Sequence, residues 1–486
     1  MMDHPRLRIT ALAASLIVSL AGCSLAPTYE RPAMDVPAQW QTEAPWRAAQ
    51  PADAAPKGPW WQRFNDPQLD KLITQALQEN QSLKVALSNL EQAQAQTRVA
   101  RASLLPTITA TNNDTRSRTS SERPLSSYTS PTMSTVQSDF VLRADVSYEA
   151  DLFGRVRNTV ANAAASEAQA GANVENFRLL LAAQVATTWY NLRETDAEIA
   201  VVQEGLALQR KALDFVTSRH QDGVASGLDL AQQQALVDST ATQAELLTKQ
   251  RAQYEHALAT LVGTPAPAFH IDPIPLQGTA PQIPVALPSD VIERRPDVAA
   301  AERGAAAANA QVGVARAAFF PSVMLNGGAG WESRDLALLF SAPTLLWSFG
   351  TQIAQTVFDA GRTRARVDFA NAAYQGAIAN YRQTVLGALQ EVEDGLAGLQ
   401  SLDRAASQAR HAVESARKVY DIAGARYEGG LATSLDVITA QQSLLNSQRA
   451  AVQILGQQMT TSVFLVKAVG GDWNHAIAAP IPTAQR

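Results

Sequence analysis

RHQDGVASGLDL at Arg219–Leu230 returns 207 residues later as RYEGGLATSLDV at Arg426–Val437. In each copy a glycine, Gly223 or Gly430, suits the left-handed residue that ends a helix. A serine or threonine then stands three residues before an aspartate, which is the pattern of a box that caps the start of a helix. Each copy therefore predicts a tight turn between two helices.

The repetition extends well beyond these turns. VARASLLP at Val99–Pro106 returns as VARAAFFP at Val314–Pro321, and the segments 132–264 and 344–479 contain no proline. Because an interior proline costs a helix about 3 kcal/mol, these gaps predict long helical regions. We predict a tandem duplication of about 200 residues, each copy reading helix, two strands, very long helix and return helix.

The helical pattern runs unbroken from Arg155 to about Ser218 and from Arg362 to about Gly424. At 1.5 Å per residue, each of these helices would be about 95 Å long. The return helix after Asp229 has a heptad rhythm, which predicts a coiled-coil seam of mostly small or polar residues. The two series of seam positions are Val237, Ala244, Arg251 and Leu258, and Thr240, Leu247, Tyr254 and Leu261.

Four segments alternate as strands do. In 137–153 the apolar residues Phe140, Leu142, Ala144, Val146 and Tyr148 alternate with mostly polar ones. The segment 345–359 alternates up to Val357, and the segments after Pro106 and Pro321 alternate more weakly. This pattern predicts two β-hairpins, each with one apolar and one polar face.

Four strands are too few to close a membrane barrel, for which about eight is the minimum. Open strand edges are not tolerated in hydrocarbon, because each unpaired backbone group costs several kcal/mol there. If the strands enter a membrane, three chains would pool about 12 strands. A soluble β-sandwich, whose polar faces would meet water, is an alternative that needs no oligomer.

The chain begins like a secreted protein. Arg6 and Arg8 precede an apolar run that ends in LAGC at Leu20–Cys23, and Cys23 is the only cysteine. This pattern resembles a bacterial lipoprotein signal, which would be removed as residues 1–22 and leave Cys23 acylated. An ordinary signal peptide with an unmodified thiol is the alternative. Ser24 favours the outer membrane, and no later apolar run is long enough for a membrane-spanning helix.

The remaining composition favours neither an enzyme nor a nucleic-acid-binding protein. Charged residues form 17% and aromatic residues 6% of the chain, which is typical of closely packed long helices. The net charge is −5, and no basic tract indicates nucleic acid. The six histidines have no metal-ligand spacing, and no nucleotide-binding or nucleophile-elbow motif occurs. We interpret Gly327–Gly330 as strand glycines and Glu391–Gly395 as solvated or tunnel-facing charge on an unbroken helix rather than a catalytic group, and we expect no enzyme, metal or cofactor.

Together, these features resemble the TolC/OprM family of outer-membrane efflux proteins, in its acylated multidrug-efflux branch. The motifs that carry the resemblance are LAGC, the paired VAR…P segments, YEADLFGR, FDAGR, NYRQTVLGALQEVEDGL and the two turn motifs. The resemblance implies a mixed α/β membrane protein. Its trimer would form an outer-membrane β-barrel, with four strands per chain, continued by an α-helical coiled-coil tunnel through the periplasm.

The resemblance also implies an equatorial belt formed by Gly58–Leu72, the linker near 265–290 and the C-terminal tail. The expected organisation is a signal peptide (1–22), a lipid-anchored and belt segment (23–62), a first repeat (63–266), a linker (267–289), a second repeat (290–472) and a tail (473–486).

The family closes its periplasmic end at the hairpin tips, and the turn motifs align with that gate. Tyr427 matches a tyrosine that helps to tie the inner helix pair shut, Leu435 an apolar gate position and Asp436 an acidic ring position. Leu228 and Asp229 are equivalent by the internal repeat, and Thr439 stands where relatives carry an acid. Helix capping by the two aspartates, and burial of Leu435 in the hairpin core, are the alternatives.

The expected function is therefore an exit duct of a tripartite efflux system for drugs or other small toxic compounds. It would be a homotrimer anchored in outer-membrane lipid by N-palmitoyl and S-diacylglycerol groups on Cys23, and it would extend into the periplasm. Its partners would be a periplasmic adaptor and an inner-membrane pump, expected to be proton-driven. The alternatives are a channel for protein or peptide secretion and a non-transport, lipid-anchored coiled-coil spacer.

Overall fold

The computed structural model describes residues 26–34, 58–118, 120, 136–281 and 294–471. Cys23, the predicted signal peptide and the tail 473–486 lie outside these residues. The chain forms two compact units. Of the described residues, the first unit contains those within 26–32, 90–169 and 301–381, and the second contains those within 33–89, 170–300 and 382–471. Because each long helix passes from one unit into the other, the units do not coincide with the two sequence repeats.

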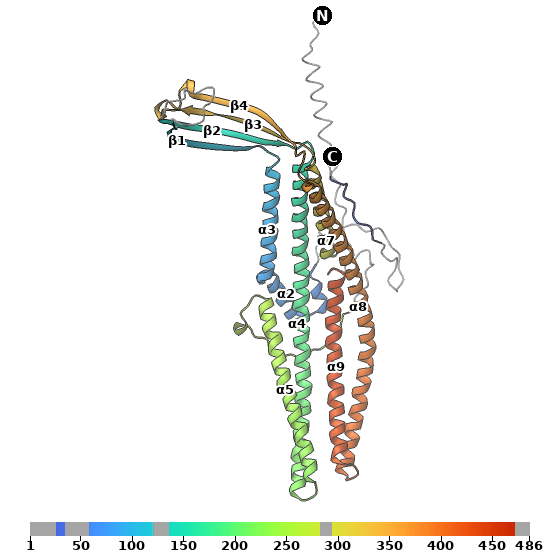
Figure 1. Ribbon diagram of the computed structural model, residues 1–486. Helices are drawn as coiled ribbons and strands as arrows, with labels where there is room; N and C mark the ends of the chain where they lie inside the picture. Colours follow the sequence, from blue (N-terminus) through green and yellow to red (C-terminus); the bar gives the residue numbers. More distant parts are fainter. Residues whose placement is uncertain (1–25, 35–57, 119, 121–135, 282–293, 472–486) are drawn as a thin grey trace. The chain divides into compact units, whose positions relative to one another are not determined.

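The two halves of the chain have the same order of elements, which confirms the predicted duplication (Figure 1). The first half contains α3 (Gln81–Ala102), β1 (Thr107–Arg118), β2 (Val136–Ala150), α4 (Arg155–Gln221) and α5 (Gly227–Leu261). The second half contains α7 (Pro296–Ala317), β3 (Ser322–Ser333), β4 (Leu345–Ala354), α8 (Arg362–Glu428) and α9 (Ser434–Ala468). Among the described residues, the first half also has a 3₁₀ helix (Trp60–Phe64) and α2 (Pro67–Glu79) before α3. The second half has two short 3₁₀ helices, Leu336–Leu338 and Ala342–Thr344, between β3 and β4. The exact boundaries proposed for the repeats stay a prediction.

The first unit contains one antiparallel sheet in the order β1-β2-β3-β4 (Figure 1). A sandwich of two sheets, the soluble alternative, is therefore not what the described strands form. One face carries the apolar residues of β2 and β4, and Trp347 on it is 76% exposed. The opposite face is mostly polar, as the alternation predicts.

The sequence predicted that the alternation of the fourth strand continues to Val357, but β4 ends at Ala354. Ser322, the first residue of β3, pairs with Ala354, and this pair ends the ladder. The residue before Ser322 is Pro321, which has no backbone N–H to continue it. Val357 therefore lies beyond the strand and is 94% exposed.

Two glycines of β3 make room for charged side chains of β2. Arg143 is paired with Gly330 and Asp145 with Gly328, and the Arg143 Nη2 and Asp145 Oδ1 atoms are 2.5 Å apart. A Cβ atom on Gly328 would come within 2.6 Å of both charged groups. On Gly330 it would come within 2.2 Å of the carbonyl oxygen of Leu142. These residues are strand glycines, as interpreted from the sequence.

The segment 26–32 contacts α7 and α8 in the first unit. The Tyr29 hydroxyl donates to Glu302 Oε1 over 2.7 Å, and Asn309 Nδ2 donates to the carbonyl oxygen of Pro27 over 2.8 Å. In the same segment, Arg31 Nε donates to the Tyr381 hydroxyl of α8 over 3.1 Å. The chain is thus fastened to α7 and α8 a few residues after Cys23.

In the second unit, α4 pairs with α5 and α8 pairs with α9 as two helical hairpins (Figure 1). Of the predicted seam positions, Val237, Thr240, Leu247 and Leu258 are buried and the other four are half-buried. Val202, Leu247 and Leu445 form an apolar cluster from three helices. Gly205 allows this close approach, since a Cβ atom there would lie 3.0 Å from Leu445. In the described part of the chain, no helix is both long and apolar enough to cross a membrane.

The sheet should not tolerate a side chain at Gly330. We expect Gly330→Ala to cost about 1–3 kcal/mol, because the added Cβ overlaps the backbone of β2. Gly350→Ala on β4 is the matched control, since nothing lies within 4 Å of a Cβ there. Thermal unfolding in detergent, followed by circular dichroism, measures both. Equal midpoints for the two variants would contradict the predicted overlap.

Candidate functional site: the hairpin ends and the contacts that hold the hairpins

The two hairpin ends are built in the same way. Gly223 and Gly430 have φ values of 75° and 74°, which end the long helices. Ser226 and Asp229 then form a reciprocal capping box, with hydrogen bonds of 3.0 and 3.2 Å. Thr433 and Asp436 form the equivalent box, with bonds of 2.8 and 3.3 Å. The capping interpretation of both aspartates is confirmed.

The Asp436 carboxylate is exposed and charged. The backbone N–H and side-chain hydroxyl of Thr433 donate to it, and Arg426 is a nearby positive charge. These groups hold the pKa of Asp436 below its ordinary value. Capping therefore fixes a negative charge at the turn and leaves it facing solvent.

Apolar side chains at the turns are also exposed in the single chain. Leu228 is 67% and Leu435 is 54% exposed. Leu435 is therefore not buried in its hairpin core, which removes that alternative. The Thr439 hydroxyl donates to the carbonyl oxygen of Leu435 over 2.8 Å. Thr439 thus adds no charge where relatives were expected to carry one.

Tyr427 connects the two hairpins near their ends. Its ring meets Phe215 of α4 edge-on, with ring centroids 6.2 Å apart. The Arg219 guanidinium carbon lies 5.3 Å from the centroid of Tyr427 and 5.7 Å from that of Phe215. Cation–π and edge-to-face contacts of this kind contribute roughly 0.5–1.5 kcal/mol each. A gate role for Tyr427 stays a prediction.

A buried ionic cluster, which the sequence did not reveal, joins α4 to α5. Asp196 is 1% exposed at its side chain and accepts from Arg193 over 3.0 Å and from Arg251 over 2.8 Å. Arg251 also pairs with Glu255 of its own helix at 2.5 Å. The only sequence signal was a charged residue, Arg251, at a seam position.

The same cluster holds the linker after α5. The backbone N–H of Ile271 donates to Glu255 over 2.7 Å, and that of Ile274 donates to Asp196 over 3.1 Å. Arg193 donates to the carbonyl oxygen of Asp272 over 2.9 Å. Buried charges are thus paired and also satisfy the backbone of the linker, as burial of charge requires.

The segment Gly58–Leu72 packs on the same stretch of α4. Trp189 Nε1 donates to Asp66 Oδ2 over 2.6 Å, while Asp66 also caps α2. The Phe64 and Tyr190 ring centroids are 5.3 Å apart. Two of the three predicted belt segments therefore lie against α4, although a belt as such stays a prediction.

Glu391, at the start of the EVEDG motif, is fully engaged by two cations. Its carboxylate accepts from Arg295 over 2.6 Å and from Lys467 over 2.7 Å. Burial alone would raise the pKa of Glu391, but the hydrogen bond from Lys467 and the charge of Arg295 lower it below its ordinary value. Glu391 is therefore a structural anion that joins α8 to α9 and to Arg295, the residue before α7.

Glu194 is a half-buried acid in a different setting. Gly456 of α9 makes room for it, because a Cβ atom there would lie 2.5 Å from Glu194 Cγ. The neighbouring Glu198 pairs with Arg449 at 2.6 Å. Burial, and to a lesser degree the charge of Glu198, raises the pKa of Glu194 from 4.5 to about 7. In the residues that the structure covers, no group of His, Cys, Asp or Glu is arranged to hold a metal ion.

Comparison with known proteins decides the family. The family model described as outer membrane efflux protein matches residues 72–264 and 287–471. The chain belongs to the outer membrane efflux protein family. The two matched segments correspond to the two halves of the duplicated chain, and the family resemblance of the sequence is confirmed.

Relatives and solved structures agree with this assignment. The chain is 35% identical over 456 residues to the probable efflux pump outer membrane protein TtgC of Pseudomonas putida, with 93% of both chains covered. It is 32% identical over 480 residues to outer membrane protein OprJ of Pseudomonas aeruginosa, with 97% of both covered. The outer-membrane channel OprN matches with a TM-score of 0.83 at 27% identity, covering 93% of this chain and all of that one. The open-state MtrE outer membrane channel of Neisseria gonorrhoeae matches with a TM-score of 0.76 at 29% identity, covering 92% and 98%.

This outer membrane efflux protein is thus the outer-membrane component of an efflux pump. Its fold is that of the outer-membrane channels, and it extends from the outer membrane into the periplasm. The expected fold class, localisation and duct function are confirmed at this level. The alternative of a non-transport spacer loses its support, because the relatives are named as efflux pump components.

The raised pKa of Glu194 predicts a pH-dependent stability. An acid whose folded pKa exceeds its ordinary value stabilises the fold below about pH 4.5, and this contribution is lost as the pH rises through about 7. Glu194→Gln should therefore leave stability nearly unchanged at pH 4.5 and raise it by about 1–2 kcal/mol at pH 8, allowing for solvent screening. Thermal midpoints across this range measure the effect. The control is Glu245→Gln on an exposed position of α5, and the two variants should not show the same pH profile.

Proposed function

We propose that the protein is the exit duct of a tripartite efflux system and works as a homotrimer. The observation that carries the proposal is the four-stranded sheet, which has an exposed apolar face. No other strand among the described residues pairs with the outer edges of β1 and β4. Three such sheets would close a barrel of about 12 strands, with apolar residues toward lipid and polar residues toward a lumen. The long hairpins would continue this lumen through the periplasm.

Small toxic compounds are the proposed cargo. Relatives at 34–35% identity are named as antibiotic, toluene and solvent efflux pump proteins. These names favour drugs and other small apolar molecules over the protein or peptide cargo of the alternative. Because the sequence contains no nucleotide-binding motif, the driving force would come from partners. We propose a periplasmic adaptor and a proton-driven inner-membrane pump.

A lipid on Cys23 would anchor each chain. The support is the LAGC motif, and the hydrogen bonds of Pro27 and Arg31 to α7 and α8 begin four residues further along the chain. Wild-type cells supplied with labelled palmitate should incorporate the label into this protein, and Cys23→Ser should abolish incorporation. Label retained by the Cys23→Ser variant would place the lipid on another residue, and absence of label from the wild type would contradict the anchor.

The hairpin ends would form the periplasmic gate. Around a threefold axis, Leu435 would give an apolar ring that can dewet a constriction, and Asp436 an acidic ring that attracts cations. Tyr427 would hold this turn against the neighbouring hairpin, and Leu228 and Asp229 would line the outer turn. Thr439 contributes no charge, so closure would depend mainly on leucine packing and on hydrogen bonds of the aspartates.

Single-channel conductance in planar bilayers tests both duct and gate. The wild-type protein should conduct weakly, and the Leu435→Ala/Asp436→Ala double variant should conduct at least several-fold more. Asp436→Asn separates gating from capping, because asparagine can still accept the Thr433 N–H hydrogen bond but has no charge. It should reduce cation preference without unfolding the turn. Asp229→Asn in the equivalent box is the matched control, with the smaller effect expected.

Two results would contradict these proposals separately. Absence of any conductance from wild type and variants would remove the duct. Conductance that is unchanged in the double variant would remove Leu435 and Asp436 from the gate while leaving the duct intact.

A further inference from the structure

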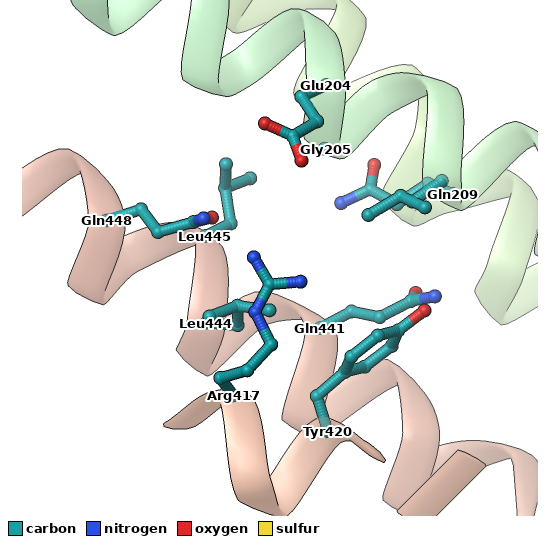
Figure 2. A pocket seen from close by; sticks show the side chains of 10 residues that line it. Glu204, Gly205, Gln209, Arg417, Tyr420, Gln441, Leu444, Leu445 and Gln448 are labelled. Atoms are coloured by element: carbon teal, nitrogen blue, oxygen red, sulfur yellow. The ribbon is translucent and has the colours of Figure 1, made fainter. Parts of the chain in front are cut away.

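A small polar cavity lies between the two hairpins within the second unit (Figure 2). Its walls come from α4 in the first hairpin and from α8 and α9 in the second. The space for water in this cavity is about 20 Å³, and the cavity is partly open to solvent. A space of this size admits one water molecule and no larger ligand.

One wall presents an amide without partners. The side chain of Gln209 is 1% exposed, and neither its Nε2 nor its Oε1 has a hydrogen-bond partner among the described residues. Figure 2 shows this carboxamide reaching from α4 into the space between the helices. An unpaired buried amide is strongly unfavourable, and native proteins satisfy such groups with other polar groups or with ordered water.

The opposite wall also carries a buried polar atom without a hydrogen-bond partner among the described residues. Gln441 of α9 is 7% exposed, and its Oε1 is also without a partner in the described part of the chain. The unpartnered carboxamide of Gln209 and the unpartnered amide oxygen of Gln441, one from each hairpin, therefore line the same water-sized space. A water molecule can donate two and accept two hydrogen bonds, so one water can bridge a polar atom of Gln209 and the Oε1 of Gln441.

The remaining walls explain how a water would be retained and exchanged. Leu445 packs over Gly205 and joins the apolar cluster with Val202, which closes one side. Glu204 and Arg417 line the other side and are exposed, which leaves a polar route to solvent.

We propose that this cavity binds one ordered water molecule, which bridges Gln209 of the first hairpin and Gln441 of the second. Water bridges are nearly as favourable as direct hydrogen bonds, and they exchange with solvent. The bridge makes this part of the contact between the hairpins polar, and its water can exchange with solvent. The apolar cluster beside it has neither property.

A double-mutant cycle on the full-length protein in detergent tests the bridge. Gln209→Met and Gln441→Met should each lower the unfolding midpoint by a few degrees, because each leaves the other amide with a poorly bound water. The combined variant should regain most of that loss, because both polar groups are gone. Additive effects, or a midpoint raised by Gln209→Met alone, would show a dry cavity and overturn the proposal.

Gln233→Met is the matched control. Gln233 is as deeply buried as Gln209, at 1% exposed, but its Nε2 donates to the carbonyl oxygen of Gln209 over 3.1 Å. Gln233→Met should lower the unfolding midpoint. In the double variant with Gln441→Met, the two decreases should simply add.

A crystal structure of the full-length wild-type protein tests the water bridge without any substitution. One density peak within hydrogen-bond distance of Gln209 and Gln441 is expected, with no anomalous signal after a thallium soak. An empty cavity, direct contact between the two amides, or a thallium peak at the site would each overturn it.

Discussion

The sheet imposes the constraint on which the rest of the molecule depends. Its apolar face, with Trp347, Phe349 and Ile353, is exposed in the single chain, and the outer edges of β1 and β4 have no partner strand in the described residues. Hydrocarbon would accept the apolar face but not the open edges. Neighbouring copies that pair these edges satisfy both demands. Glycines at 328 and 330 let the polar face carry Arg143 and Asp145 without breaking the strand pairing.

The two halves of the chain share geometry but have diverged in chemistry. In the first half, Asp196 and Arg251 form a buried ion pair between α4 and α5. The equivalent positions 207 residues later are Asp403 and Gln458, joined by a hydrogen bond of 2.8 Å. The first pair has an additional task, because its cluster also binds the backbone of the linker after α5. A duplicated helical hairpin has thus kept its shape while one copy became the attachment point for other segments.

Local patterns predicted most of the fold. The repeat, the capping boxes at Asp229 and Asp436, and the alternation of β2 depend on residues that are neighbours in sequence. The strand end at Ala354 was missed, because it is set by Pro321 on the partner strand. The contacts of Arg193 with Asp272 and of Glu194 with Gly456 were not predicted either. Each joins residues far apart in the chain, and no periodicity records which charge meets which backbone group.

At the hairpin ends, too, the sequence predicted the local contacts but not the packing between distant segments. Sequence spacing predicted how Asp436 caps α9, but it could not decide whether Leu435 is buried, since this depends on packing between hairpins. Exposure of Leu435 and of the Asp436 carboxylate leaves both available to neighbouring copies. The polar cavity at Gln209 was equally hidden from sequence, because a buried glutamine looks like any other seam residue until its partners are known.

The number of chains in the detergent-extracted particle tests the central claim most directly, because closure of the sheet requires other copies. Native mass spectrometry of protein purified from outer membranes should give particles of three chains that need surfactant to stay dissolved. A monomer that stays dissolved without surfactant would contradict the account, since its strand edges and apolar face would then need no neighbours.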